Sequence, residues 1–294
     1  MPIPPSRLRH PCQYLAGRVS SRIANLRDRW LDPAAFSFFQ AMVAGGFDPE
    51  AHIDVLPRQR LIYVSVPKCA STTIKSVLSA VESGQTPPAN KIHIRRHSGL
   101  NSPRHAGFST FRRLAADPSA LRFAFVRSPY ARLVSAWADK FQAKPLVPGD
   151  AFVDLYLAHR ASVDRALPQG AQQTLSFAEF VEFATATCSS RVNAHWNLQD
   201  DLLAMPGIAL NLVGKVESFR DDFARVLDHV GANGATLPAL DTNYNTSRHR
   251  PWPEYYDDAL AWRVYRAYER DFDRFRYPRT TGPALTPGLP VSRL

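Results

Sequence analysis

The 294-residue chain has few of the residues that cross-link a protein or anchor it in a membrane. Its three cysteines, Cys12, Cys69 and Cys188, form no CxxC pair and have no metal-ligand spacing. Such a sparse, odd set argues against a disulfide scaffold and is typical of a reducing compartment. No apolar run approaches the ~20 residues that span a bilayer. The start, MPIPPSRLRH, lacks the apolar stretch of a secretory signal, so we expect a cytoplasmic protein.

Acidic residues are fewer than basic ones, with 26 Asp and Glu against 36 Lys and Arg, which gives a net charge of +10. Excess positive charge favours anionic partners such as nucleotides, sulfated or carboxylated sugars, nucleic acid or a membrane surface. Charge alone does not choose among these partners. Hydrophobic residues make up 45% of the chain, which is enough for a sizeable core and argues against global disorder.

We expect three regions along the chain. Residues 1–57 form a basic extension, 58–280 the main domain and 281–294 a flexible tail. Apolar residues in the extension fall on one face of a predicted helix: Leu15, Val19, Ile23, Leu26 and Trp30. This basic amphipathic helix could make a peripheral membrane contact or pack on the domain.

The stretch that organises the domain is LIYVSVPKCASTTIK, residues 61–75. Residues 61–66 predict a buried strand, Pro67 breaks it, and a short loop of small and hydroxylated residues then leads into a helix. The first N–H groups of a helix lack intrahelical acceptors, and the helix dipole adds positive potential there. Residues 67–73, which we call the anion loop, are therefore predicted to bind phosphate or sulfate. Its polar side chains are Lys68, Ser71, Thr72 and Thr73.

A second apolar strand, LRFAFV at 121–126, runs into Arg127 and then into the helix YARLVSAWADKF. Further strands are predicted at 91–94 and 208–213, and residues 95–110 are predicted as a basic loop. Strands alternating with helices predict an α/β fold, a P-loop-like three-layer arrangement with a central, mainly parallel sheet flanked by helices. Ligands bind beyond the carboxyl ends of such strands, so Arg127 should lie beside the anion loop.

Local signals also place three later helices. Ser176 and Glu179 fit a capping box. Ser218 is a candidate N-cap of a helix that Gly231 ends. Pro253 is expected to open the last helix, which carries an aromatic face.

The anion loop differs from a Walker A loop because it lacks the pattern G-x-x-x-x-G-K-[ST]. Its lysine stands at the start of the loop. The strand at 121–126 ends in Arg127, where a nucleotide triphosphatase usually holds a magnesium-binding aspartate. Two cationic strand ends without a carboxylate predict a direct grip on the anion, without a metal.

PKCASTTIK followed by FVRSPYARLVSAWADKF resembles the nucleotide-binding motifs of sulfotransferases that use 3′-phosphoadenosine-5′-phosphosulfate (PAPS). The resemblance implies that the loop Lys68, Cys69, Ala70, Ser71, Thr72 and Thr73 binds the 5′-phosphosulfate. It also implies that Arg127 and Ser135 bind the 3′-phosphate. Comparable C-terminal loops close over the nucleotide in that family, which makes Arg248 and Arg250 candidate contacts, with solvated loop charges as the alternative.

Later motifs narrow the resemblance to the carbohydrate branch of sulfotransferase family 2, which contains the chondroitin and dermatan 4-sulfotransferases. FAEFVEF, NAHW, NLVGKVESF and a final aromatic helix recur there in this order, and the match covers roughly residues 58–277. The resemblance implies a carbohydrate acceptor, as an anionic glycan or a glycolipid, and no nucleic-acid partner. Without a membrane anchor, the chain is expected to be a soluble, bacterial-type member.

Sulfuryl transfer needs a base for the acceptor hydroxyl, and histidine is the usual choice near neutral pH. His195 in the NAHW motif is the first candidate and His105 the second. Lys68 is the candidate that neutralises charge on the bridging oxygen.

Two other functions remain open from the residues. A P-loop-type kinase would share the architecture but should need Mg²⁺. A non-catalytic polyanion-binding protein would explain the net charge but not the two anion-binding segments at strand ends.

Overall fold

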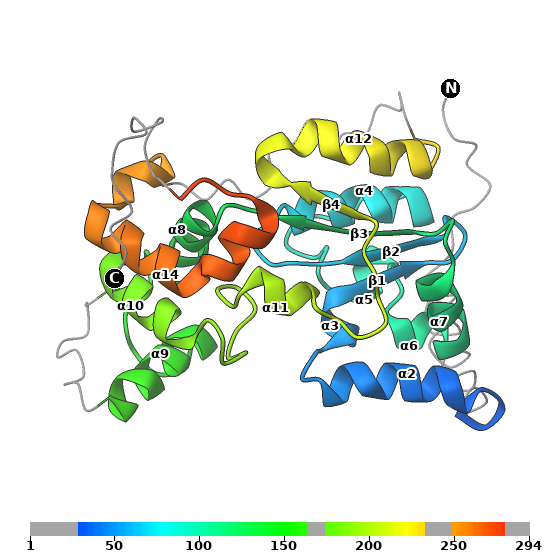
Figure 1. Cartoon of the computed structure of the whole chain (residues 1–294), viewed down its shortest axis with the longest axis horizontal. Helices are drawn as coiled ribbons and strands as arrows, with labels where there is room; N and C mark the ends of the chain where they lie inside the picture. Colours follow the sequence, from blue (N-terminus) through cyan, green and yellow to red (C-terminus); the bar gives the residue numbers. More distant parts are fainter. Residues whose placement is uncertain (1–28, 164–173, 233–248, 280–294) are drawn as a thin grey trace. The chain divides into compact units, whose positions relative to one another are not determined.

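The computed structural model describes residues 29–163, 174–232 and 249–279 (Figure 1). The chain divides into two compact units, one formed by Met1–Arg127 with Asp201–Thr246, the other by Ser128–Asp200 with Ser247–Leu294. Most of the predicted N-terminal helix, Arg248 and the predicted tail lie outside the described residues. In the described parts of the chain, no helix combines the length and apolarity needed to cross a bilayer.

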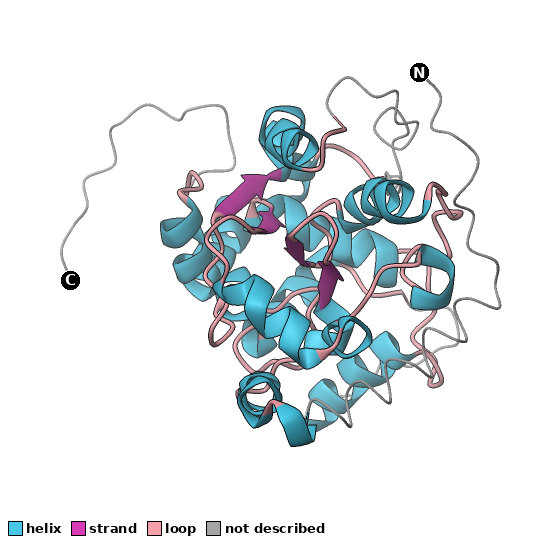
Figure 2. Cartoon of the chain, turned by 90° about the vertical axis from the view of Figure 1, so that its right-hand side faces the viewer, coloured by secondary structure: helices cyan, strands magenta, loops and turns pink. Residues whose placement is uncertain are grey.

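The first unit is built on a four-stranded sheet, seen in magenta in Figure 2. Its strands follow the order β1 (Ile53–Leu56), β2 (Leu61–Val64), β3 (Leu121–Val126) and β4 (Leu212–Lys215). β1 is antiparallel to β2, whereas β2, β3 and β4 are parallel. All four residues of β2 are buried, as expected for a strand covered on both faces. The predicted α/β fold with a mainly parallel sheet is confirmed.

Helices cover both faces of this sheet. Figure 1 shows α4 (Ser71–Ser83) and α12 (Phe219–His229) on one side, and α6 (Pro103–Ala106) and α7 (Phe108–Ala116) on the other. The unit also contains α2 (Pro33–Ala44), α3 (Pro49–His52), α5 (Arg95–Ser98) and the 3₁₀ helix η1 (Val216–Ser218). α12 starts directly after Ser218, but the Ser218 side chain makes no capping bond to the helix backbone. Gly231 follows α12 with φ of +66°, as predicted for a stop.

Three sequence predictions in this unit are wrong. Residues 91–94, predicted as a strand, form turns. Ile92 is buried between exposed neighbours, and this pattern imitates the alternation of a strand. The predicted loop at 95–110 contains α5, α6 and the start of α7. The last strand lies at 212–215 and not at 208–213. In addition, β1 precedes the predicted domain start at residue 58, so the sheet begins earlier than predicted.

The described part of the second unit is mainly helical. Its helices are α8 (Pro129–Lys140), α9 (Ala151–Ser162), α10 (Phe177–Thr187), the 3₁₀ helix η2 (Trp252–Tyr255) and α14 (Asp258–Phe275). α11 (Gln199–Leu203) begins at the boundary between the units. The capping box of Ser176 and Glu179 is present at α10. The last helix begins at Asp258 and not at Pro253, because the Asp257 carboxylate accepts the N–H of Leu260 and caps it there.

Candidate active site

The anion loop turns sharply between β2 and α4. Lys68 and Ala70 both have left-handed backbone conformations, with φ of +69° and +58°. Residues other than glycine rarely adopt this conformation, and it is concentrated at functional sites. Backbone turns that contain left-handed residues are one of the conformations that form anion-binding concavities in proteins. The two left-handed residues agree with the predicted anion loop, whose binding of an anion stays a prediction.

α4 begins directly after these two residues. Ala70 occupies the N-cap position, where it has no side-chain oxygen to accept the first N–H groups of the helix. Thr72 in the first turn is buried, and its Oγ1 lies 3.0 Å from Nε2 of His93. His93 thus contacts the anion loop, although the sequence predicted only a strand at residues 91–94.

Arg127 lies where its sequence position predicts. It follows β3, whose residues pair in parallel with β2, so both strands end at the same edge of the sheet. Its Nη1 is 3.5 Å from the carbonyl oxygen of Lys68. The structure therefore brings the two predicted anion-binding segments together, while the part each residue plays in binding stays a prediction.

A buried ionic cluster connects β1, α4 and α5 next to the anion loop. Asp54 of β1 is 1% exposed, and its carboxylate lies 3.1 Å from Nζ of Lys75 on α4 and 2.7 Å from Nη1 of Arg95 on α5. Removing Asp54 would leave the two cations without their counter-charge, at a cost of about 3–5 kcal/mol. The cluster ties the helix that carries the anion loop to the edge strand.

His105, the second candidate base, belongs to the same unit. Its Nδ1 lies 2.7 Å from Oγ of Ser102, which donates a hydrogen bond of 2.7 Å to Oε2 of Glu50. The ring is half-buried at the end of α6.

His195, the first candidate base, lies in the second unit. Its Nδ1 and its backbone N–H both bond Oδ1 of Asn193, at 2.7 and 3.0 Å. The ring meets Phe152 edge to face, with centroids 5.2 Å apart. His195 is therefore oriented on both sides by neighbours within its own unit.

The remaining predicted contacts also belong to the second unit. Ser135 is buried on α8. Arg250 is exposed, and its guanidinium lies 3.5 Å from Glu254 and over the ring of Tyr255. Whether Arg250 contacts the nucleotide stays a prediction.

The comparisons with known proteins agree with this geometry. Residues 51–278 match the model of the sulfotransferase family. The chain belongs to the sulfotransferase family. The comparison with solved structures gave no match.

Several curated relatives are carbohydrate sulfotransferases. The chain is 29% identical to carbohydrate sulfotransferase 12 of Mus musculus, over 78% of this chain and 60% of the mouse protein. It is 28% identical to carbohydrate sulfotransferase 10 of Xenopus laevis, over 78% of this chain and 68% of the relative. The chain is also 28% identical to carbohydrate sulfotransferase 11 of Mus musculus, over 77% of this chain and 67% of the mouse protein. The alignments thus span about three-fifths to two-thirds of these relatives.

The structure of this sulfotransferase also gives a role to a residue that the sequence left unassigned. Arg132 of α8 is 1% exposed and donates hydrogen bonds to the carbonyl oxygens of Ala194, at 2.6 Å, and Asn197, at 2.7 Å. The second arginine of the RSPYARL segment therefore holds the NAHW segment in place. Its spacing in the motif was visible in the sequence, but its partner was not.

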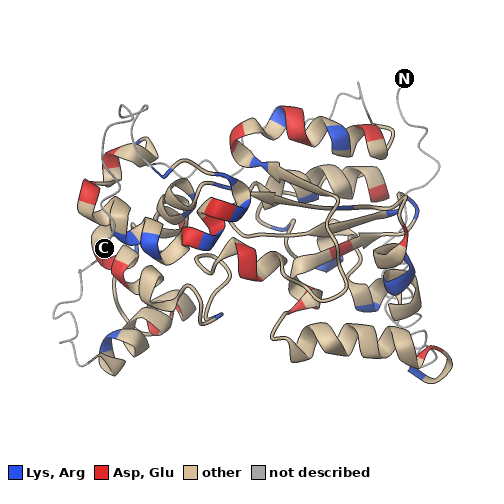
Figure 3. Ribbon diagram, in the orientation of Figure 1, with Lys and Arg blue, Asp and Glu red and all other residues tan. Residues whose placement is uncertain are grey.

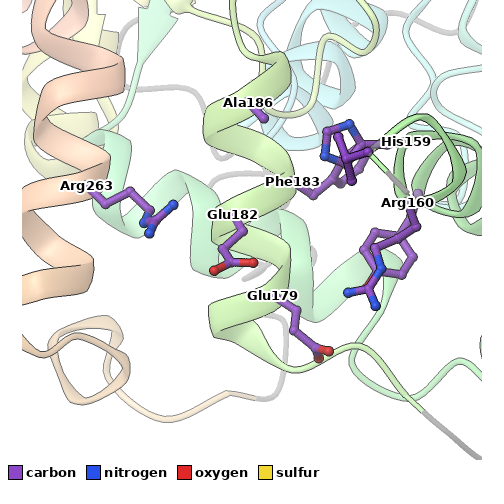
Figure 4. Close-up of a pocket in the computed structure, with 9 residues that line it drawn as sticks. His159, Arg160, Glu179, Glu182, Phe183, Ala186 and Arg263 are labelled. Atoms are coloured by element: carbon purple, nitrogen blue, oxygen red, sulfur yellow. The ribbon is translucent and has the colours of Figure 1, made fainter. Parts of the chain in front are cut away.

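A cavity lies within the second unit, between α9, α10 and α14 (Figure 4). It has a volume of about 200 Å³, which is below the usual ~300–1,000 Å³ of ligand pockets. Figure 4 shows Arg263 of α14 pointing toward Glu182 of α10. None of the predicted site residues is among those that line this cavity.

Proposed function

We propose that this sulfotransferase transfers a sulfuryl group from PAPS to a hydroxyl of a carbohydrate acceptor. The observation that carries the proposal is the contact of two cationic segments at one sheet edge, where Arg127 meets the left-handed backbone of Lys68. Family membership supports the same chemistry. Backbone N–H groups, hydroxyls and fixed cations suit the donor, which carries phosphate and sulfate groups.

In the proposed reaction, the acceptor oxygen forms a bond to sulfur while the bond from sulfur to the phosphate oxygen breaks. Adenosine 3′,5′-bisphosphate leaves, and the acceptor proton passes to a base. Lys68 neutralises the charge that develops on the bridging oxygen. A sulfuryl group carries less negative charge than a phosphoryl group, so lysine and backbone donors can stabilise it without a metal. The described residues hold no group of three His, Cys, Asp or Glu side chains placed to bind a metal ion.

His195 and His105 are both proposed as candidate bases. Each places Nδ1 against an oxygen of its own unit, Asn193 for the first and Ser102 for the second. Replacing each with alanine and measuring rate against pH separates them. The variant that lacks the true base should lose the limb of the pH–rate profile that reports the titration of that base.

The acceptor class rests on the relatives and on charge. The curated relatives are named carbohydrate sulfotransferases, and a chain with a net charge of +10 favours an anionic glycan or glycolipid over a neutral one. A cytoplasmic location, a peripheral membrane contact through the N-terminal helix and the absence of a nucleic-acid partner belong to the same proposal.

The test is a transfer assay with ³⁵S-labelled PAPS over a panel of glycans, with mass spectrometry of the products. Lys68→Ala should lower turnover by about 100- to 1,000-fold, since it removes a donor to developing charge. Lys91→Ala, an exposed lysine outside the anion loop, is the control and should keep near-normal turnover. Near-normal turnover of Lys68→Ala would contradict the proposed role.

A kinase is separated from this function by titration calorimetry without metal. Adenosine 3′,5′-bisphosphate should bind, and ATP should bind poorly. The reverse order of affinity would favour the kinase.

A further inference from the structure

Glu50, Ser102 and His105 form a hydrogen-bonded chain in the first unit. Ser102 is fully buried, and its Oγ lies 2.7 Å from both the Glu50 carboxylate and Nδ1 of His105. The other carboxylate oxygen of Glu50 accepts the backbone N–H of Arg104 at 2.9 Å. Glu50 is thus held from two sides by the helix that carries His105.

The number of protons available in this hydrogen-bonded chain determines the tautomer of His105. A serine hydroxyl has one proton, and an ionised carboxylate can only accept. The Ser102 proton therefore goes to Glu50, and Ser102 Oγ must accept from His105. His105 accordingly carries its proton on Nδ1, which places the basic lone pair of the neutral ring on Nε2.

Glu50 also lies just before β1, whose start is next to the end of β2 and so to the anion loop. α3 leads directly into β1, whose first residue pairs with the last residue of β2. The backbone N–H of Ser65, just before the anion loop, donates to the carbonyl oxygen of His52 at 2.7 Å. The Glu50 carbonyl accepts from Nε of Arg95 at 3.0 Å, and Arg95 belongs to the ionic cluster behind α4. Hydrogen bonds and ion pairs thus connect Glu50 to the anion-loop helix.

We propose that Glu50 and Ser102 are positioning residues that hold His105 as the Nδ1–H tautomer, with Nε2 as the nitrogen that accepts the acceptor's proton. This inference rests on the proposed function, in which His105 is one of two candidate bases. It adds the residues that orient this histidine and the nitrogen that acts. The arrangement resembles other sites in which an acceptor behind a histidine fixes its tautomer and direction.

The tautomer is tested directly by the long-range ¹H–¹⁵N correlation spectrum of the histidine rings in the full chain, with His105→Ala used to assign the signal. The wild-type ring should show protonated Nδ1. Glu50→Ala frees the Ser102 proton to bond Nδ1, so His105 should change to the Nε2–H tautomer. Ser98→Ala removes another buried hydroxyl of the same unit and should leave the His105 signal unchanged. A wild-type ring protonated on Nε2, or an unchanged tautomer in Glu50→Ala, overturns the proposal.

Kinetic measurements then test whether the hydrogen-bonded chain of Glu50, Ser102 and His105 affects turnover. Ser102→Ala should lower kcat by about 10- to 100-fold with KM for PAPS little changed, because the loss of a partner that orients a histidine typically costs on that order. Equal kcat in Ser102→Ala and wild type, with His105→Ala impaired, overturns the positioning role while sparing the base. Unimpaired His105→Ala removes His105 as the base and with it the catalytic part of the inference, leaving His195 for the proposed function.

Discussion

Two residues of the anion loop, Lys68 and Ala70, hold a backbone conformation that side chains disfavour. A left-handed residue with a Cβ costs roughly 1–2 kcal/mol. At Ala70 there is no side-chain capping bond that could offset this cost. The strain is consistent with a loop shaped for a ligand at some expense of stability.

Ala70→Gly should therefore raise the free energy of unfolding by about 0.5–1 kcal/mol, since glycine adopts this conformation without steric cost. Ala80→Gly, in the interior of α4, should lower it by about 1 kcal/mol. Urea denaturation of both variants measures the two effects. Destabilisation of similar size at both positions would contradict the assignment of strain at Ala70.

At the level of elements, the NAHW segment of the second unit is held by three helices. Arg132 of α8 binds its carbonyl groups, and Trp196 Nε1 donates to Thr187 Oγ1 of α10 at 3.0 Å. On α14, the Tyr268 hydroxyl donates to the carbonyl oxygen of Trp196. Buried Asp271 accepts the backbone N–H groups of Gln199 and Asp200 at the start of α11. Burial raises the pKa of Asp271, and these bonds oppose that rise.

Arg132→Ala should lower the stability of the second unit by about 3 kcal/mol or more, since it leaves two carbonyl oxygens short of a charged donor in a buried site. Arg132→Lys should recover only part of this, because an ammonium cannot reproduce the planar fork of the guanidinium. Thermal denaturation measures the loss. Arg266→Ala, which removes an exposed arginine of α14, is the control and should cost well under 1 kcal/mol. An equally mild effect at Arg132 would show that it does not hold the segment.

At the scale of the whole molecule, the net charge of +10 is the dominant long-range property. Figure 3 shows basic and acidic residues interspersed on α12 and α14 rather than separated. Long-range attraction of an anionic acceptor should therefore depend on the summed charge and be screened by salt.

For an anionic glycan, kcat/KM should fall by about tenfold between roughly 50 and 300 mM salt, as the Debye length shortens. A neutral oligosaccharide that accepts sulfate should show little change, which makes it the control. Initial rates at low acceptor concentration provide the measurement. Equal salt dependence for both acceptors would contradict a role for charge in selecting the glycan.

The sequence by itself determined the local elements with strong signals. The run of apolar residues at 121–126 became β3, and the capping box at Ser176 became the start of α10. The anion loop and Arg127 were also predictable, because the carboxyl ends of neighbouring parallel strands share one edge. These features depend on residues that are close in sequence or on a general rule of sheet topology.

Only the tertiary structure decided which distant groups meet. Glu50 and Ser102 give no sequence signal of their own, since their partnership with His105 depends on how α3 and α6 pack. The same holds for Asp54 with Lys75, and for Arg132 with the carbonyl groups of the NAHW segment. Contacts between residues far apart in the chain depend on the path of the backbone, which a short pattern does not encode.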